Sequence, residues 1–110
     1  MALQFACKVS DLDAGEATCV TLPDGDGKAI KVAVVRDSDG TFHAIGDTCS
    51  HGDVPLSEGD VEDGTIECWG HGAQFDLETG QPTLPATEPV PVYELTLDGD
   101  DVLVDVDASK

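Results

Sequence analysis

Apolar and polar residues alternate along most of the chain. The alternation covers several short segments: 3–9, 16–22, 28–36, 41–46, 73–80, 92–97 and 102–106. A period of two puts successive side chains on opposite faces of a β-strand. No segment sustains the 3.6-residue repeat of an amphipathic helix, and at most one helical turn is expected near residues 10–14. The pattern predicts an all-β protein.

Turn residues separate the expected strands. PDGDG at 23–27 joins the second strand to the third, and DGDD at 98–101 joins the last two strands into a closing hairpin. In the first strand, Leu3, Phe5, Cys7 and Val9 are expected to face the core. Residues 81–91 carry four prolines and are expected to form an extended loop.

Many short strands joined by turns indicate an antiparallel β-sandwich or small barrel. At 110 residues the chain has room for one domain, 1–110. Residues 47–75 interrupt the strand pattern and are expected to form an insertion of two loops on that scaffold. Within the insertion, VEDGTIE at 61–67 predicts a hairpin that folds Cys68 back towards Cys49.

Charge narrows the range of partners. Asp and Glu number 23 against five Lys and Arg, which gives a formal net charge of −18. Such a surface repels nucleic acid and anionic membranes and attracts a basic docking surface. Solubility, or adaptation to a salty cytoplasm, would account for the same composition. Asp47, Asp53, Glu58 and Asp60 are expected near the two loops, either as a docking surface or as an ordinary solvated face.

The chain carries four cysteines, and residues 1–9 do not resemble a secretory signal. No apolar run is long enough to cross a membrane. We therefore expect a cytoplasmic, monomeric protein without a disulfide framework.

Two pairs of soft donors stand out. Cys49 and His51 form C-x-H, and sixteen residues later Cys68 and His71 form C-x-x-H. A cysteine nucleophile with a histidine base leaves the second pair without a role. A zinc-stabilised binding module fits the donor types, although zinc fingers usually pair Cys with Cys and His with His. Alternation instead suits a two-iron centre, in which each loop supplies one ligand to each metal.

C-x-H followed by C-x-x-H-G resembles the Rieske family of [2Fe-2S] proteins, and the resemblance extends over residues 3–106. It implies the Rieske fold, with a small two-loop cluster-binding subdomain and one cluster per chain. It also implies that Cys49 and Cys68 bind one iron and that His51 and His71 bind the other. Gly52 and Gly72, which follow the histidines, would let backbone N–H groups approach the cluster. Trp69 stands where many family members have proline.

The chain departs from respiratory Rieske proteins. Val54 and Gly70 replace the cysteines that form their loop disulfide, and Ala73 and Phe75 replace hydroxyl residues that hydrogen-bond the cluster. Fewer donors leave the reduced state less stabilised, which predicts a potential of about −150 mV.

The resemblance is therefore to the free-standing Rieske ferredoxins, which are electron carriers and not enzymes. It implies transfer from a flavin-dependent reductase to a terminal oxygenase. The small subunit of NADH-dependent nitrite reductase and the Rieske proteins of iron–sulfur assembly operons are the alternatives. Outside the motif, Cys7 and Cys19 are expected to be buried structural thiols, and His43 a packed or surface histidine.

Overall fold

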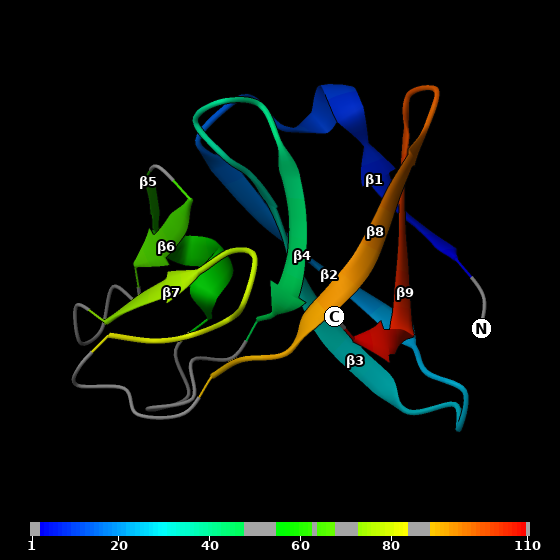
Figure 1. Ribbon diagram of the computed structural model, residues 1–110. Coiled ribbons are helices and arrows are strands. Elements are labelled where there is room, and N and C mark those ends of the chain that lie inside the picture. The colour runs from blue at the N-terminus through cyan, green and yellow to red at the C-terminus, as the bar shows by residue number, and fades with distance from the viewer. Residues whose placement is uncertain (1–2, 48–54, 63, 68–72, 84–88, 110) are drawn as a thin grey trace.

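The computed structural model describes residues 3–47, 55–62, 64–67, 73–83 and 89–109. Within them, nine antiparallel strands form two sheets (Figure 1). The strands are β1 (Gln4–Lys8), β2 (Glu16–Pro23), β3 (Ala29–Arg36), β4 (Phe42–Gly46), β5 (Asp60–Glu62), β6 (Thr65–Glu67), β7 (Gln74–Asp76), β8 (Val92–Asp98) and β9 (Asp101–Ser109). The prediction of an all-β fold is confirmed.

Two short 3₁₀ helices complete the described secondary structure. η1 (Val9–Asp11) follows β1, close to the helical turn expected near residues 10–14. η2 (Leu56–Glu58) precedes β5 and was not expected from the sequence. Among the described residues no helix is long and apolar enough to cross a membrane.

The large sheet has the order β1-β9-β8-β4-β3-β2, and it curls so that its two edge strands approach each other. The Gln4 side-chain amide donates a hydrogen bond of 2.7 Å to the Pro23 carbonyl, which links β1 to β2. This nearly closed, barrel-like sheet encloses a core of aliphatic side chains with Phe42.

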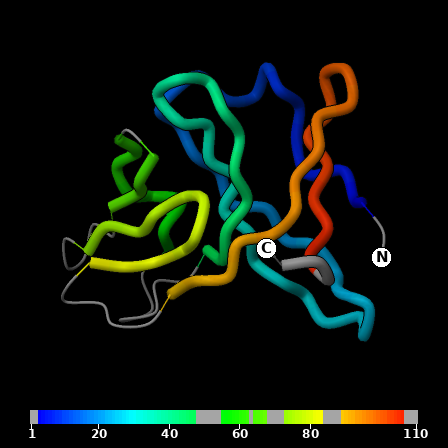
Figure 2. The backbone as a smooth tube through the Cα atoms, in the orientation of Figure 1, coloured from blue at the N-terminus to red at the C-terminus, as the bar shows by residue number. Residues whose placement is uncertain are grey.

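The small sheet has the order β5-β6-β7 and lies beside β4, on the side away from β9 (Figures 1 and 2). A second core joins it to the large sheet, with Ile66 and Phe75 from the small sheet packed with Ile45 of β4. Leu56 of η2 and Leu77 belong to the same core.

Strand β3 faces both cores. Val32 and Val34 belong to the barrel core, whereas Ala33 and Val35 belong to the core shared with the small sheet. The continuous apolar run VAVV is the sequence signature of a strand buried on both faces. β3 and β4 therefore form the wall on which the small sheet is mounted.

The prediction for the first strand is wrong in part. Cys7 is buried, but Leu3 is 46% and Phe5 is 51% exposed. The pairing of β1 with β9 shifts between Phe5 and Cys7, so Phe5 lies opposite Leu103 and Cys7 opposite Val102. A β-bulge of this kind moves the residues on one side of it to the other face of the sheet.

Candidate metal centre

The four predicted ligands lie outside the described residues. Cys49 and His51 fall in segment 48–54, and Cys68 and His71 fall in segment 68–72. The structure does describe the residues on either side of both segments. Those flanking residues define how the scaffold holds the two ends of each segment.

Asp47 joins the two ends of the first segment by hydrogen bonds. We call the described residues that join the two ends of a segment its base. The residue follows β4, is only 4% exposed, and its N–H donates to the Lys31 carbonyl at 3.2 Å. Across the segment, the Leu56 N–H donates to the Asp47 carbonyl and the Ser57 N–H donates to Asp47 Oδ1 at 2.9 Å. Main chain and side chain of one residue thus tie the end of β4 to the start of η2.

Sheet pairing closes the base of the second segment. β6 ends at Glu67 and β7 begins at Gln74, and these two residues are paired in the antiparallel register. Gln74 also forms two hydrogen bonds with Thr83. Its N–H donates to Thr83 Oγ1 at 2.9 Å, and its carbonyl accepts the Thr83 N–H at 2.8 Å. Ala73, directly after the segment, is fully buried.

The two bases are in contact. A Cβ atom added at Gly59, just after η2, would overlap the carbonyl oxygen of Glu67, so only glycine allows this approach. Leu56 and Ala73 also share the core that joins the two sheets. Residues following the first segment therefore pack against residues bordering the second.

The positions after the second segment are apolar and fully buried. Ala73 and Phe75 are both 0% exposed and pack in the shared core. Neither side chain can donate a hydrogen bond.

The residues expected to form an acidic surface behave differently from one another. Glu58 and Asp60 are exposed, as a docking surface requires. Asp47 is buried and accepts hydrogen bonds, so its assignment to that surface is wrong. Asp53 lies outside the described residues.

The two remaining cysteines differ. Cys7 is buried as expected, and burial, with a smaller effect of the Asp11 charge, raises the pKa of its thiol. Cys19 is exposed, so the prediction of a buried thiol is wrong there. Desolvation of the thiol, a hydrogen bond to Asp47 and the Asp47 charge raise the Cys19 pKa to about 11, against the opposing charge of Lys31.

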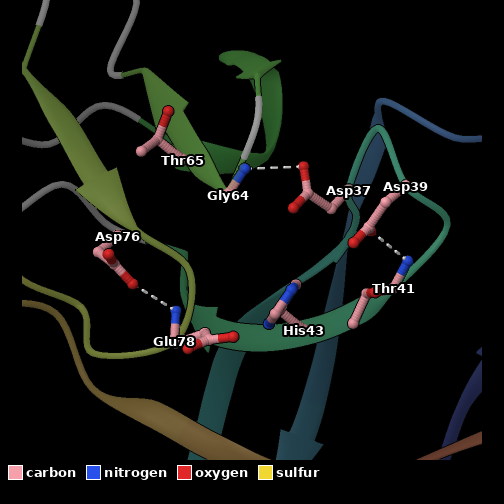
Figure 3. A pocket seen from close by; sticks show the side chains of 8 residues that line it. All are labelled: Asp37, Asp39, Thr41, His43, Gly64, Thr65, Asp76 and Glu78. Atoms are coloured by element: carbon pink, nitrogen blue, oxygen red, sulfur yellow. Dashed lines mark hydrogen bonds between the residues drawn. The ribbon is translucent and has the colours of Figure 1, made fainter.

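His43 is packed, as one of the two expectations had it. It lines a cleft of about 170 Å³ between the β3–β4 turn and the small sheet, which the sequence did not predict (Figure 3). The other lining residues are Asp37, Asp39, Thr41, Gly64, Thr65, Asp76 and Glu78.

Three of the cleft carboxylates hold turns together. Asp37 Oδ1 accepts the Ser38 and Gly64 N–H groups, Asp39 Oδ1 accepts the Thr41 N–H, and Asp76 Oδ1 accepts the N–H groups of Glu78 and Thr79. Within the described part of the chain, no group of three or more His, Cys, Asp or Glu is arranged to hold a metal ion. The cleft is a structural junction between the two sheets.

Comparison with known proteins adds an independent line of support. The model of the Rieske [2Fe-2S] domain matches residues 2–94. The 3-phenylpropionate/cinnamic acid dioxygenase ferredoxin subunit of Escherichia coli (strain K12) is 40% identical over 105 residues, covering 93% of this chain and 92% of that protein.

Solved structures agree. A chain in the complex of reduced oxygenase and oxidized ferredoxin of carbazole 1,9a-dioxygenase matches with a TM-score of 0.80 at 37% identity, over 92% of this chain and 99% of that chain. A Mycobacterium tuberculosis protein described as an NADH-dependent nitrite reductase small subunit matches with a TM-score of 0.80 at 26% identity, over 94% of this chain and 93% of that chain.

These matches confirm the predicted Rieske fold, the predicted [2Fe-2S] cofactor and the role of electron carrier in place of enzyme. The chain belongs to the Rieske [2Fe-2S] family.

Proposed function

We propose that Cys49 and Cys68 bind one iron of a single [2Fe-2S] cluster, and that His51 and His71 bind the other. The observation that supports this most is the contact between the bases of the two segments, where Gly59 meets the Glu67 carbonyl. Two segments held at adjacent bases can present their donors to one centre. In this proposal residues 47–75 form the cluster-binding part of one domain.

The donor set fits the cofactor. Two thiolates and two neutral imidazoles are the ligands of a Rieske centre, which takes up and releases one electron when bound. The chain contributes by ligation and by excluding water with the apolar residues Leu56, Ala73 and Phe75, all 0% exposed. His51 and His71 would provide the outer edge through which the electron enters and leaves.

We further propose that the protein carries electrons from a flavin-dependent reductase to a terminal oxygenase. The oxygenase partner is supported by the relatives, which are a dioxygenase ferredoxin subunit and a ferredoxin bound to its oxygenase. The net charge of −18 suits a basic docking surface on each partner and favours a monomer through self-repulsion. A cytoplasmic location fits the free thiols of Cys7 and Cys19.

A role as the small subunit of a nitrite reductase is the second candidate, supported by the match to the M. tuberculosis protein. Lower identity than to the dioxygenase ferredoxins, 26% against 40%, makes it the weaker of the two. Both roles use the same one-electron centre and differ only in the acceptor.

Metal analysis of the aerobically purified protein tests the ligand assignment. We expect two iron and two sulfide per chain and a red-brown colour, whereas a colourless protein with one zinc would support the zinc-stabilised module and refute the assignment. His51→Cys is expected to retain a cluster at a lower potential, because a thiolate replaces a neutral ligand. At a zinc site the same change would leave metal content almost unaltered.

Electron transfer to purified acceptors tests the partner. With a flavin reductase and NADH, we expect reduction of a Rieske dioxygenase and no support of nitrite reduction. The reverse pattern would favour the second candidate.

A further inference from the structure

We propose that Asp47 is the positioning residue of the first ligand segment, and that its hydrogen bonds across the base of this segment control how firmly the cluster is held. The inference rests on the proposed assignment of Cys49 and His51 as ligands. It goes beyond that assignment because Asp47 itself is not a ligand.

The argument begins with burial. Asp47 is 4% exposed, in a chain whose other 22 acidic residues give it no shortage of surface carboxylates. Burying an ionised carboxylate costs free energy unless hydrogen bonds replace its water. A buried Asp at this place therefore needs specific partners.

Hydrogen bonds join Asp47 to two elements, one through its main chain and one through its carboxylate. The Asp47 N–H donates to the Lys31 carbonyl in β3, and the Asp47 carboxylate accepts the Ser57 N–H in η2 at 2.9 Å. Bonds to an ionised acceptor are stronger than those between neutral groups. One side chain thus fixes η2 against the barrel.

The position of these bonds decides what they control. Asp47 lies two residues before Cys49, and Ser57 lies three residues after segment 48–54. The Asp47–Ser57 bond therefore spans the whole segment that carries the first two ligands. When it opens, the main-chain bond from the Leu56 N–H to the Asp47 carbonyl is left to hold the two ends of the segment together.

Asp37 offers a matched control. It is also buried, at 6% exposed, and its Oδ1 accepts the Gly64 N–H at 3.0 Å, so it too ties the large sheet to the small one (Figure 3). However, Asp37 precedes β4, and Gly64 lies in the turn between β5 and β6, at the end of the β5–β6 hairpin away from Cys68. Loss of this bond weakens the junction without releasing a ligand segment.

The experiment compares Asp47→Ala with Asp37→Ala in the cluster-loaded protein. Iron release to a chelator is followed by visible absorption, at a temperature set equally far below each variant's own Tm. We expect release from Asp47→Ala to be about tenfold faster than from wild type, since a lost buried hydrogen bond shifts local opening by about this factor. Asp37→Ala should stay within about twofold of wild type.

Conservative variants separate position from charge. Asp47→Asn keeps the shape and an acceptor oxygen but loses the charge, whereas Asp47→Glu keeps the charge and displaces the carboxylate. A positioning role predicts slow iron release and an unbroadened EPR signal for Asp47→Asn, and fast release with a broadened signal for Asp47→Glu. This pair also decides the question should Asp47→Ala not fold.

Two results would overturn the inference. One is equal iron release from Asp47→Ala and Asp37→Ala; the other is that Asp47→Glu behaves as wild type while Asp47→Asn does not. Wild-type protein that binds no iron would instead refute the ligand assignment, before any variant is measured.

Discussion

At the scale of single residues, two buried side chains are expected to lower the potential of the centre. Ala73 and Phe75 stand at the positions where high-potential family members are expected to carry hydroxyls, and both are 0% exposed in the shared core. Apolar side chains at these positions would offer the cluster no side-chain donor, and fewer donors to the reduced, more negative state would lower its potential.

Ala73→Ser restores one hydroxyl and should raise the midpoint potential. One hydrogen bond of about 1 kcal/mol corresponds to roughly 40 mV for a one-electron couple. Ala33→Ser is the matched control, since Ala33 is equally buried in the same core but lies on β3. Redox titration of both variants checks this: equal shifts, or none at Ala73→Ser, would show that the hydroxyl does not reach the cluster.

Cys19 should react slowly although it is exposed. Its pKa of about 11 keeps the thiol protonated at pH 8, and the protonated form is not the nucleophile. Asp47→Asn removes the hydrogen-bonded charge that contributes to this shift, so alkylation by iodoacetamide should become faster, while Asp37→Asn leaves it unchanged. Mass spectrometry of the Cys19 peptide between pH 7 and 10 gives the rates, and a wild-type rate typical of a free thiol would contradict the interpretation.

The raised pKa of Cys19 also makes the free energy of unfolding depend on pH. The folded protein holds the Cys19 proton more tightly than the unfolded chain, whose thiol pKa is near 9.0. Between about pH 9 and pH 11 the native state therefore binds more protons, and this contribution to stability is lost as the pH rises.

Single residues also mark the limit of what the sequence reveals. The C-x-H and C-x-x-H pairs predict the ligands because few other residue sets share their chemistry. The sequence predicts a surface position for Asp47, since an aspartate in an acidic chain carries no signal of burial. Its one clue is its position at the end of a strand directly before the ligand motif.

At the scale of elements, close backbone packing between the end of η2 and the end of β6 sets the distance between the two bases. Gly59 has φ of −82°, a conformation open to any residue, so its requirement for glycine is steric. A side chain there would collide with the Glu67 carbonyl.

Gly59→Ala should therefore destabilise the protein by about 1–3 kcal/mol, because backbone must move to admit a methyl group. It should also accelerate iron release, since the bases of both segments separate. Gly27→Asn is the control: this turn glycine has φ of +81° and open space around it, and Asn tolerates that conformation. Thermal unfolding of the loaded proteins checks both; a Tm for Gly59→Ala equal to wild type would show that the two bases do not pack as described.

Element boundaries were predictable where apolar segments were bounded by distinct turn residues. β2, β3 and the β8–β9 hairpin lie within a residue or a few of the expected ranges. The bulge in β1 was not predictable because Ala6 is small and apolar, so the alternation gives no sign that the inward face changes there. η2 is too short to show a helical repeat.

At the scale of the whole molecule, we expect charge to guide the association of the protein with its redox partners. Net charge of −18 on 110 residues produces a field that extends about one Debye length, roughly 8 Å at physiological ionic strength. Glu58 and Asp60 are exposed next to the bases of the ligand segments, where such a field would guide a basic partner.

Electron transfer from the reductase should therefore slow as salt rises, through a lower association rate. Glu58→Gln combined with Asp60→Asn should weaken the salt dependence, while Asp26→Asn in the exposed β2–β3 turn leaves it unchanged. Stopped-flow reduction at several NaCl concentrations measures this. If the double variant shows the same slope as wild type, the acidic surface near the segments takes no part in docking.

An EPR-monitored redox titration of the purified protein tests the central claim most directly, since it reports ligand type and potential together. We expect a one-electron transition with a midpoint of about −150 mV and a reduced-state signal whose average g lies below the free-electron value. A midpoint of about −400 mV would indicate an all-cysteine cluster, and a strongly positive midpoint would contradict the role assigned to Ala73 and Phe75.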